Sequence, residues 1–245
     1  MIQLRDFGIG YGPDRLLLSG VNTDIQAGEL TALVGRNGSG KSTLLRAVAG
    51  LNRNYTGVIN IDVPGPMSRR LAFVNTQRVR IPGMSCADVV ALGRAPYTDW
   101  SGRLSLADKD AVAHALSLTG MSQYAHRTMD RMSDGECQRI MIARALAQGT
   151  PIILLDEPTS FLDMPARYEL CALLRKLTEE QGKCIVFSTH ELDIALRMCR
   201  RVMLIDSPRL HNMPADAMAA SGLIARLFNN PAMCFDSLSE TLSKT

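Results

Sequence analysis

The sequence lacks any apolar run long enough to span a membrane, and its first residues, MIQLRDFGIGYG, lack the long apolar core of a signal peptide. Internal repeats, low-complexity stretches and Gly/Ser linkers are absent as well. We therefore expect a soluble chain, which can still dock on a membrane protein. Its 245 residues suffice for one large α/β unit or two closely joined subdomains.

A strong excess of charge of one sign is also missing. Lys and Arg number 27 against 24 Asp and Glu, and they are scattered, so charge does not favour a nucleic-acid partner. The six cysteines include no CxxC pair, and several fall within apolar patterns. We expect reduced thiols in a cytosolic protein at Cys86, Cys137, Cys171, Cys184, Cys199 and Cys234.

Three short apolar runs are typical of buried parallel strands: 30–34 (LTALV), 152–155 (IILL) and 184–187 (CIVF). Polar residues follow each run: GRNGSGKS after the first, Asp156-Glu157 after the second and Ser188-Thr189-His190 after the third. The carboxyl ends of parallel strands meet at one edge of a sheet, where α/β proteins bind ligands. The three polar segments are therefore expected to form one site.

The run from Gly35 to Ser42 matches the phosphate-binding pattern GxxxxGK[ST] and lies between a predicted strand and a helix predicted over 42–49. Backbone amides of such a loop wrap phosphates, Lys41 reaches the outer phosphates and Ser42 can bind Mg²⁺. A Gly-rich turn is the alternative, which the correct flanks disfavour. The expected ATP contacts are Gly35, Asn37, Gly38, Ser39, Gly40, Lys41, Ser42 and Thr43.

Two carboxylates follow the second strand. Asp156 is expected to bind Mg²⁺, and Glu157 to orient or deprotonate the attacking water. His190 either starts a helix as a structural residue or contacts the γ-phosphate, and its place beside the other strand ends favours the contact. Glu157, His190 and Lys41 are thus the predicted catalytic residues.

The stretch RMSDGECQRIMIARA (131–145) predicts a helix that begins with a capping box, because Ser133 and Glu136 have the required spacing. The start of this helix is small and polar, as expected where a helix N-terminus meets an anion. Two further capping-box spacings, Ser85 with Asp88 and Ser105 with Asp108, predict helix starts, and Gly182 is expected to end a helix.

Together these motifs resemble those of the ATP-binding subunits of ATP-binding-cassette (ABC) transporters, over nearly the whole chain. The run from Ser133 to Gln138 resembles the family's signature, LSGGQ in its commonest form, and lies just upstream of LLDEP. The resemblance implies a head-to-tail, ATP-bound homodimer in which Ser133, Asp134, Gly135 and Glu136 meet the ATP of the other copy. Asp134 replaces a Gly, so its side chain is expected to point away from phosphate.

Other residues receive roles from the resemblance alone. Tyr11 lies where the family has an aromatic that stacks on adenine, although it can equally be a tyrosine beside a turn. Gln77 matches the glutamine that senses Mg²⁺, and Asp163 matches the aspartate that touches the opposing subunit. The expected metal ligands are Ser42, Gln77 and Asp156.

The fold expected from the resemblance is α/β: a P-loop NTPase core with a mainly parallel sheet, a flanking antiparallel β subdomain and an inserted helical subdomain. In this single domain, 1–77 and 150–205 form the core with the β subdomain, 78–149 the helical subdomain, and 206–245 a C-terminal extension without motif. Four segments are assigned to the antiparallel subdomain: MIQLRDF, LLLSGVNTDI, GVINID and RLAFV.

Residues 80–105 closely resemble the corresponding region of importer subunits for iron-siderophore, haem or cobalamin uptake. This implies a Mg²⁺-dependent ATPase on the cytoplasmic face of the membrane, bound to an integral membrane permease dimer and served by a periplasmic or surface substrate-binding protein. Arg94, Tyr97 and Trp100 either line the groove for the permease or are ordinary surface residues.

Three alternatives stay open. A DNA-repair-type clamp ATPase is disfavoured, because only 115 positions separate Lys41 from Asp156 and no heptad run for a long coiled coil lies between them. A non-hydrolysing regulatory module is disfavoured by Glu157 and His190. An ABC ATPase for another substrate is the third, since the ATP-binding subunit never touches the transported molecule.

Overall fold

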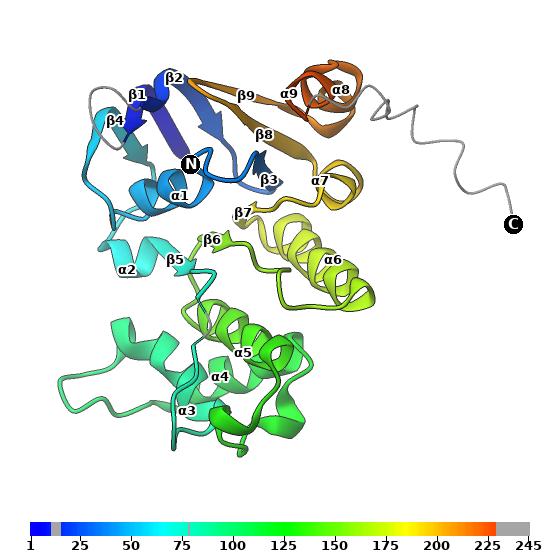
Figure 1. The fold of residues 1–245 in the computed structure, drawn as a ribbon. Helices are drawn as coiled ribbons and strands as arrows, with labels where there is room; N and C mark the ends of the chain where they lie inside the picture. The colour runs from blue at the N-terminus through cyan, green and yellow to red at the C-terminus, as the bar shows by residue number, and fades with distance from the viewer. Residues whose placement is uncertain (11–15, 78, 229–245) are drawn as a thin grey trace, which may run out of the picture.

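The computed structural model describes residues 1–10, 16–77 and 79–228 (Figure 1). The strands are β1 (Ile2–Gly10), β2 (Leu16–Ile25), β3 (Leu30–Gly35), β4 (Tyr55–Ile61), β5 (Leu71–Val74), β6 (Ile152–Asp156), β7 (Cys184–Ser188), β8 (Arg201–Asp206) and β9 (Arg209–Pro214). The helices are α1 (Lys41–Val48), α2 (Met67–Arg70), α3 (Cys86–Ala91), α4 (Leu106–Leu118), α5 (Asp134–Ala147), α6 (Met164–Gln181), α7 (Leu192–Met198), α8 (Ala215–Ala220) and α9 (Leu223–Phe228).

The central sheet has six strands in the order β5-β6-β7-β3-β8-β9. The first five in this order run parallel, and β9 runs antiparallel along the edge of β8. A second, antiparallel sheet has the order β2-β1-β4. The expected α/β fold is therefore confirmed, and so are the three parallel strands that end in polar residues.

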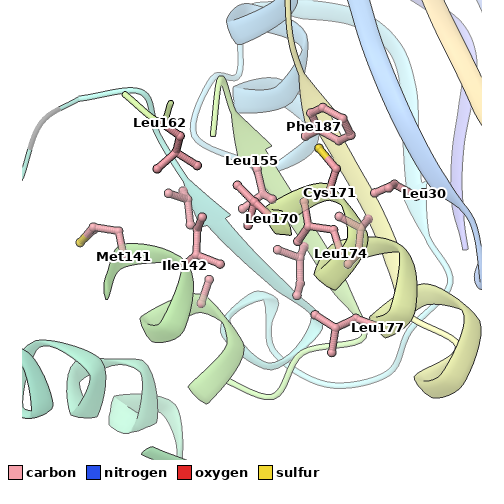
Figure 2. Close-up of a cluster of buried hydrophobic side chains, with 14 of the residues drawn as sticks. Leu30, Met141, Ile142, Leu155, Leu162, Leu170, Cys171, Leu174, Leu177 and Phe187 are labelled. Carbon is pink, nitrogen blue, oxygen red and sulfur yellow. The ribbon is translucent and has the colours of Figure 1, made fainter. Parts of the chain in front are cut away.

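Both faces of the central sheet are covered, which explains why its strands are continuously apolar. On β6, Leu154 packs toward Leu44 of α1 and the antiparallel sheet, whereas Leu155 belongs to the cluster formed with α5 and α6. Figure 2 shows Leu155, Leu170 and Leu174 between α6 and the sheet. Leu170, Leu174 and Leu177 of α6 are thus part of the core.

The assignment of RLAFV to the antiparallel subdomain is wrong. β5 pairs parallel with β6, with Leu71 opposite Ile152 and Val74 opposite Leu155, so it is an edge strand of the central sheet. Leu71, Ala72 and Val74 are all buried, and an unbroken buried run suits a sheet covered on both faces. The other three segments do form β1, β2 and β4.

Helices α3, α4 and α5 pack against one another below the central sheet in the view of Figure 1. The predicted capping boxes of α3 and α4 are confirmed, because Ser85 and Ser105 accept hydrogen bonds from the backbone N–H groups of Asp88 and Asp108. Gly182 ends α6 in the left-handed conformation, with φ of 63°. The subdomain boundaries near 78 and 149 stay a prediction.

No helix in the described part of the chain is long and apolar enough to cross a bilayer. The cysteines at positions 86, 137, 171, 184 and 199 are free and buried, and burial raises the pKa of the Cys171 and Cys184 thiols to about 12. Cys234 lies outside the described residues. Within 206–228 the chain forms β9, α8 and α9.

Candidate functional site

The phosphate loop (35–42) connects β3 to α1, where a helix start faces the carboxyl edge of the sheet. Gly40 is the N-cap of α1 with φ of 103°, a conformation that glycine adopts without strain. A Cβ at this position would lie 3.0 Å from Leu17 Cδ1, so a side chain would also crowd Leu17. Gly40 makes no side-chain cap, and the first amides of α1 are available to an anion.

Lys41 is held inside this loop. Its Nζ donates hydrogen bonds to the carbonyl oxygens of Gly35 at 3.0 Å and Arg36 at 3.3 Å. Burial lowers the pKa of Lys41, and the charges of Glu157 and Asp156 act in the opposite direction. The ammonium group is therefore positioned where the sequence predicts an outer phosphate.

Asp156, at the end of β6, joins the phosphate loop to the neighbouring strand. Its Oδ1 accepts hydrogen bonds from Ser42 Oγ at 2.9 Å and from Ser188 Oγ at 2.7 Å. Its Oδ2 is buried and has no hydrogen-bond partner among the described residues. A desolvated carboxylate oxygen next to a serine hydroxyl is an oxygen donor set of the kind that Mg²⁺ prefers, so these residues fit the expected metal ion.

Glu157 has a left-handed backbone, with φ of 49°, which is uncommon for a residue other than glycine. Its N–H donates a hydrogen bond of 2.9 Å to Ser188 Oγ, and Ser160 Oγ donates one of 3.0 Å to its carbonyl oxygen. His190 follows two residues after Ser188 and is exposed. The structure thus brings Lys41, Ser42, Asp156, Glu157 and His190 to one edge of the sheet.

Gln77 lies in the loop after β5, which is tied to the same edge. Thr76 Oγ1 donates a hydrogen bond of 3.1 Å to the carbonyl oxygen of Asp156. Gln77 itself is exposed, and its Oε1 accepts a hydrogen bond of 3.3 Å from Asn75 Nδ2. Its predicted contact with Mg²⁺ stays a prediction.

A solvent-open cavity of about 700 Å³ lies between the antiparallel sheet and the start of α1. Gly10, Thr43, Arg53 and Tyr55 are among its lining residues. Thr43 connects this cavity to the phosphate loop, and its volume suits a nucleotide-sized ligand. Tyr11, the predicted adenine contact, lies outside the described residues.

The predicted capping box at the start of α5 is confirmed. Ser133 Oγ accepts a hydrogen bond of 3.3 Å from Glu136 N–H, and Glu136 Oε2 accepts one of 2.8 Å from Ser133 N–H. A Cβ on Gly135 would lie 3.3 Å from the carbonyl oxygen of Phe161, so the loop before α6 packs closely on this helix start. Asp134 forms an ion pair of 2.7 Å with Arg80.

Asp163 is the N-cap of α6, and its side chain accepts a hydrogen bond of 3.0 Å from Ala166 N–H. Helix α5 packs mainly against α3 and α4, whereas α1 packs against β3 and β6. The structure therefore places the signature residues 133–136 on a helix that packs against other elements than α1 does, below the central sheet in the view of Figure 1. Within one chain, the predicted site falls into two groups.

Arg94 and Tyr97 have structural partners. Arg94 Nε pairs with Asp108 at 2.8 Å, Arg94 Nη1 donates to the carbonyl oxygen of Ala147, and its guanidinium lies 3.9 Å from the centre of the Tyr97 ring. These contacts hold α4 and α5 together with the short 3₁₀ helix at Leu92–Tyr97. Trp100, in contrast, is almost fully exposed.

Three residues were not predicted to act in the site: Ser188, Thr76 and Arg80. Ser188 belongs to a polar segment that the sequence does indicate, but its two bonds depend on the pairing of β7 with β6. Arg80 begins the segment 80–105, which gave it no role, and its partner lies 54 positions further along the chain. No sequence signal pointed to Thr76 or Arg80.

Comparison with known proteins agrees with this geometry. The sequence profile of the ABC transporter family matches residues 18–160. The iron(3+)-hydroxamate import ATP-binding protein FhuC of Bacillus subtilis is 36% identical over 203 residues, which are 80% of this chain and 75% of that protein.

Two solved structures are also similar. A transporter described as of the metal-chelate type, in an inward-facing conformation, aligns with a TM-score of 0.84 and 28% identity, over 93% of this chain and 88% of the other. A dimeric ATP-binding cassette in a post-hydrolysis state with ADP and Pi aligns with a TM-score of 0.76 and 28% identity, over 88% and 99%. With phosphate loop, strand-end carboxylates and signature helix in place, this chain belongs to the ABC transporter family.

Proposed function

We propose that this chain is the Mg²⁺-dependent ATP-hydrolysing subunit of an importer, and that it drives uptake of an iron complex, either a siderophore or haem, or of cobalamin. It works as a homodimer on the cytoplasmic face of the membrane, bound to a separate permease dimer and served by a substrate-binding protein. The Asp156 carboxylate is the main observation in favour of ATP hydrolysis. One of its oxygens accepts a hydrogen bond from Ser42, and the other is buried without a partner in the described structure. Similarity to FhuC supports the class of substrate.

ATP is bound first by the phosphate loop. The amides of 36–40 and the start of α1 surround the β- and γ-phosphates, and the Lys41 ammonium neutralises them. The base and sugar occupy the cavity beside Thr43. The family resemblance alone assigns Tyr11 to stacking on the adenine. Five residues of the loop contribute backbone groups or let the backbone approach the phosphates closely: Gly35, Asn37, Gly38, Ser39 and Gly40.

Ser42, Asp156 and Gln77 hold the metal ion. When bound, Mg²⁺ neutralises charge on the phosphate oxygens. Asp156 Oδ2 supports this role because a buried carboxylate oxygen without a partner is costly unless a cation or donor satisfies it.

Glu157 acts on the attacking water. Its left-handed backbone is held through Ser188 at the strand end, close enough to Lys41 for the charge of Glu157 to act on that ammonium group. Glu157 orients the water and accepts its proton, while His190 contacts the γ-phosphate. Catalysis rests on position and charge, since phosphoryl transfer needs little covalent help from the protein.

The second copy completes each site. The positive end of the α5 dipole and the Ser133 hydroxyl suit a γ-phosphate, but α5 lies apart from α1 of its own chain. Ser133, Asp134, Gly135 and Glu136 therefore meet the ATP held by the other subunit, and Asp163 contacts the opposing chain. The dimeric state of a structurally similar cassette supports this arrangement.

The variant Glu157→Gln tests the ATPase and the dimer together. We expect it to bind ATP with Mg²⁺ as the original chain does, to lose turnover and to accumulate as a stable dimer on a sizing column. Glu180→Gln, which changes an exposed carboxylate on α6, is the matched control and should hydrolyse ATP normally. A Glu157→Gln chain that binds ATP and remains monomeric would contradict the proposed dimer.

Uptake assays test the substrate class. Cells carrying either the original chain or Glu157→Gln are given labelled ferric siderophore, haem or cobalamin. Loss of uptake of one compound in the variant identifies the substrate. Normal uptake of all three compounds would contradict the proposed class and leave an ABC ATPase for another substrate.

A further inference from the structure

The start of α5 carries an ion pair that reaches it from a distant loop. Arg80 Nη2 donates a hydrogen bond of 2.7 Å to Asp134 Oδ1. Arg80 lies three positions after Gln77, in the segment that connects β5 to α3. The hydrogen bond and the charge of Asp134 raise the pKa of Arg80. The first turn of α5 is thus joined to the loop that contains Gln77.

This helix start has an unusual charge for a phosphate-binding element. Asp134 and Glu136 place two carboxylates in its first turn. Glu136 is held by the capping box, where Ser133 N–H donates to its Oε2 at 2.8 Å. The amides and the dipole of α5 attract an anion, but an uncompensated Asp134 would repel it. Arg80 supplies the compensating positive charge.

The ion pair closes a junction of three segments. A small cavity of about 10 Å³ is lined by Val79 and Arg80, by Asp134 and Gln138 of α5, and by Phe161 of the loop before Asp163. Gln138 is buried, and its Nε2 has no hydrogen-bond partner in the described part of the structure. Packing here leaves the Asp134 side chain directed toward Arg80.

We propose that Arg80 is a positioning residue for the ATP-bound dimer: its pair with Asp134 holds that carboxylate aside and reduces the negative charge at Ser133, so that the γ-phosphate of a second copy's ATP can approach. This inference rests on the proposed function, in which the start of α5 meets the ATP of the other subunit. Arg80 acts through Asp134, so its effect depends on whether residue 134 is charged.

The test compares four chains that all carry Glu157→Gln: no further change, Arg80→Gln, Asp134→Asn, and both together. The fraction of dimer is measured by light scattering as ATP and Mg²⁺ are raised. Arg80→Gln should increase the ATP concentration at half-maximal dimer about tenfold, because the Asp134 carboxylate then loses the positive charge of Arg80 beside the phosphate. In chains that carry Asp134→Asn, Arg80→Gln should change this concentration little, because residue 134 then has no charge, so the double variant should recover from the effect of Arg80→Gln.

A control and a fold measurement complete the test. Arg139→Gln removes an arginine of α5 that pairs with Glu169, and it should leave dimer formation unchanged. Melting temperatures of all variants should stay within a few degrees, since the Arg80 pair is exposed. Two results would overturn the role of Arg80 but not the proposed function. One is that the Arg80→Gln chain dimerises at the same ATP concentration as the chain with Glu157→Gln only, and the other is that the double variant does not recover. Failure of the Glu157→Gln chain itself to dimerise with ATP would overturn both proposals.

Discussion

The hydroxyl of Ser188 donates a hydrogen bond of 2.7 Å to Asp156 Oδ1. Ser188 Oγ in turn accepts a hydrogen bond of 2.9 Å from the N–H of Glu157, whose backbone is left-handed. One buried side chain at the end of β7 therefore orients both the proposed metal ligand and the proposed catalytic base.

We predict that Ser188→Ala lowers kcat about tenfold, with the KM for ATP changed little. Two hydrogen bonds of about 1 kcal/mol each are lost, while the phosphate loop keeps its contacts with ATP. Steady-state ATPase measurements over a range of ATP concentrations separate the two constants. Thr31→Val is the control, because it removes a buried hydroxyl of β3 that has no partner among the described residues. An unchanged kcat in Ser188→Ala would contradict a positioning role.

Local signals predicted most of the core. Continuous apolar runs identified β3, β6 and β7, and Ser-x-x-acidic spacings identified the starts of α3, α4 and α5. These patterns work because burial and capping depend on residues that are close in sequence. The segment that became β5 was misplaced, since the choice between two sheets depends on the partner strand and not on the strand's own residues.

Contacts between residues that are far apart in the sequence could not be predicted from such local patterns. The bonds of Asp156 with Ser42 and Ser188 cross 114 and 32 positions. The convergence of three strand ends nevertheless predicted that these regions meet. The pair of Arg80 with Asp134 was unpredictable, because nothing in either neighbourhood specifies a partner across 54 positions.

We predict that Asp156→Asn removes most of the effect of Mg²⁺ on ATP affinity. In the original chain, Mg²⁺ should tighten binding of a fluorescent ATP analogue at least tenfold relative to EDTA, because Asp156 holds the ion that neutralises the phosphates. The amide of Asn keeps the shape of the side chain and removes its charge. Asp193→Asn, a control at an exposed carboxylate paired with Tyr168, should keep the full effect. An equal Mg²⁺ effect in Asp156→Asn would rule out this metal ligand.

Ser133 and Ser105 allow stability to be separated from function, because both form capping boxes at helix starts. We predict that Ser133→Ala and Ser105→Ala each reduce the free energy of unfolding by about 1 kcal/mol. Only Ser133→Ala should also reduce kcat/KM for ATP, by about tenfold or more, since only Ser133 meets a phosphate. Urea unfolding and ATPase assays on both variants provide the comparison. Equal losses of activity would mean that Ser133 serves only its helix.

Asp108 provides a prediction on acid stability, at a site distant from the proposed chemistry. Hydrogen bonds from Ser105 and Arg94 lower the pKa of Asp108 to about 2. A carboxyl group whose pKa is lower in the folded state adds stability above the pKa of the unfolded chain, at about 4, and this contribution disappears as the pH falls toward 2.

Asp108→Asn should therefore lower the melting temperature at pH 7 by roughly 5 °C, because Arg94 loses its charged partner at the junction with Ala147. The difference in urea midpoint between the original chain and this variant should stay constant from pH 7 to 5 and shrink between pH 4 and 2. Thr31→Val changes no titratable group, so the difference in urea midpoint between this variant and the original chain should not depend on pH in this way. If the difference in urea midpoint between the original chain and Asp108→Asn is as large at pH 3 as at pH 7, the lost contacts, and not the charge of Asp108, account for the loss of stability.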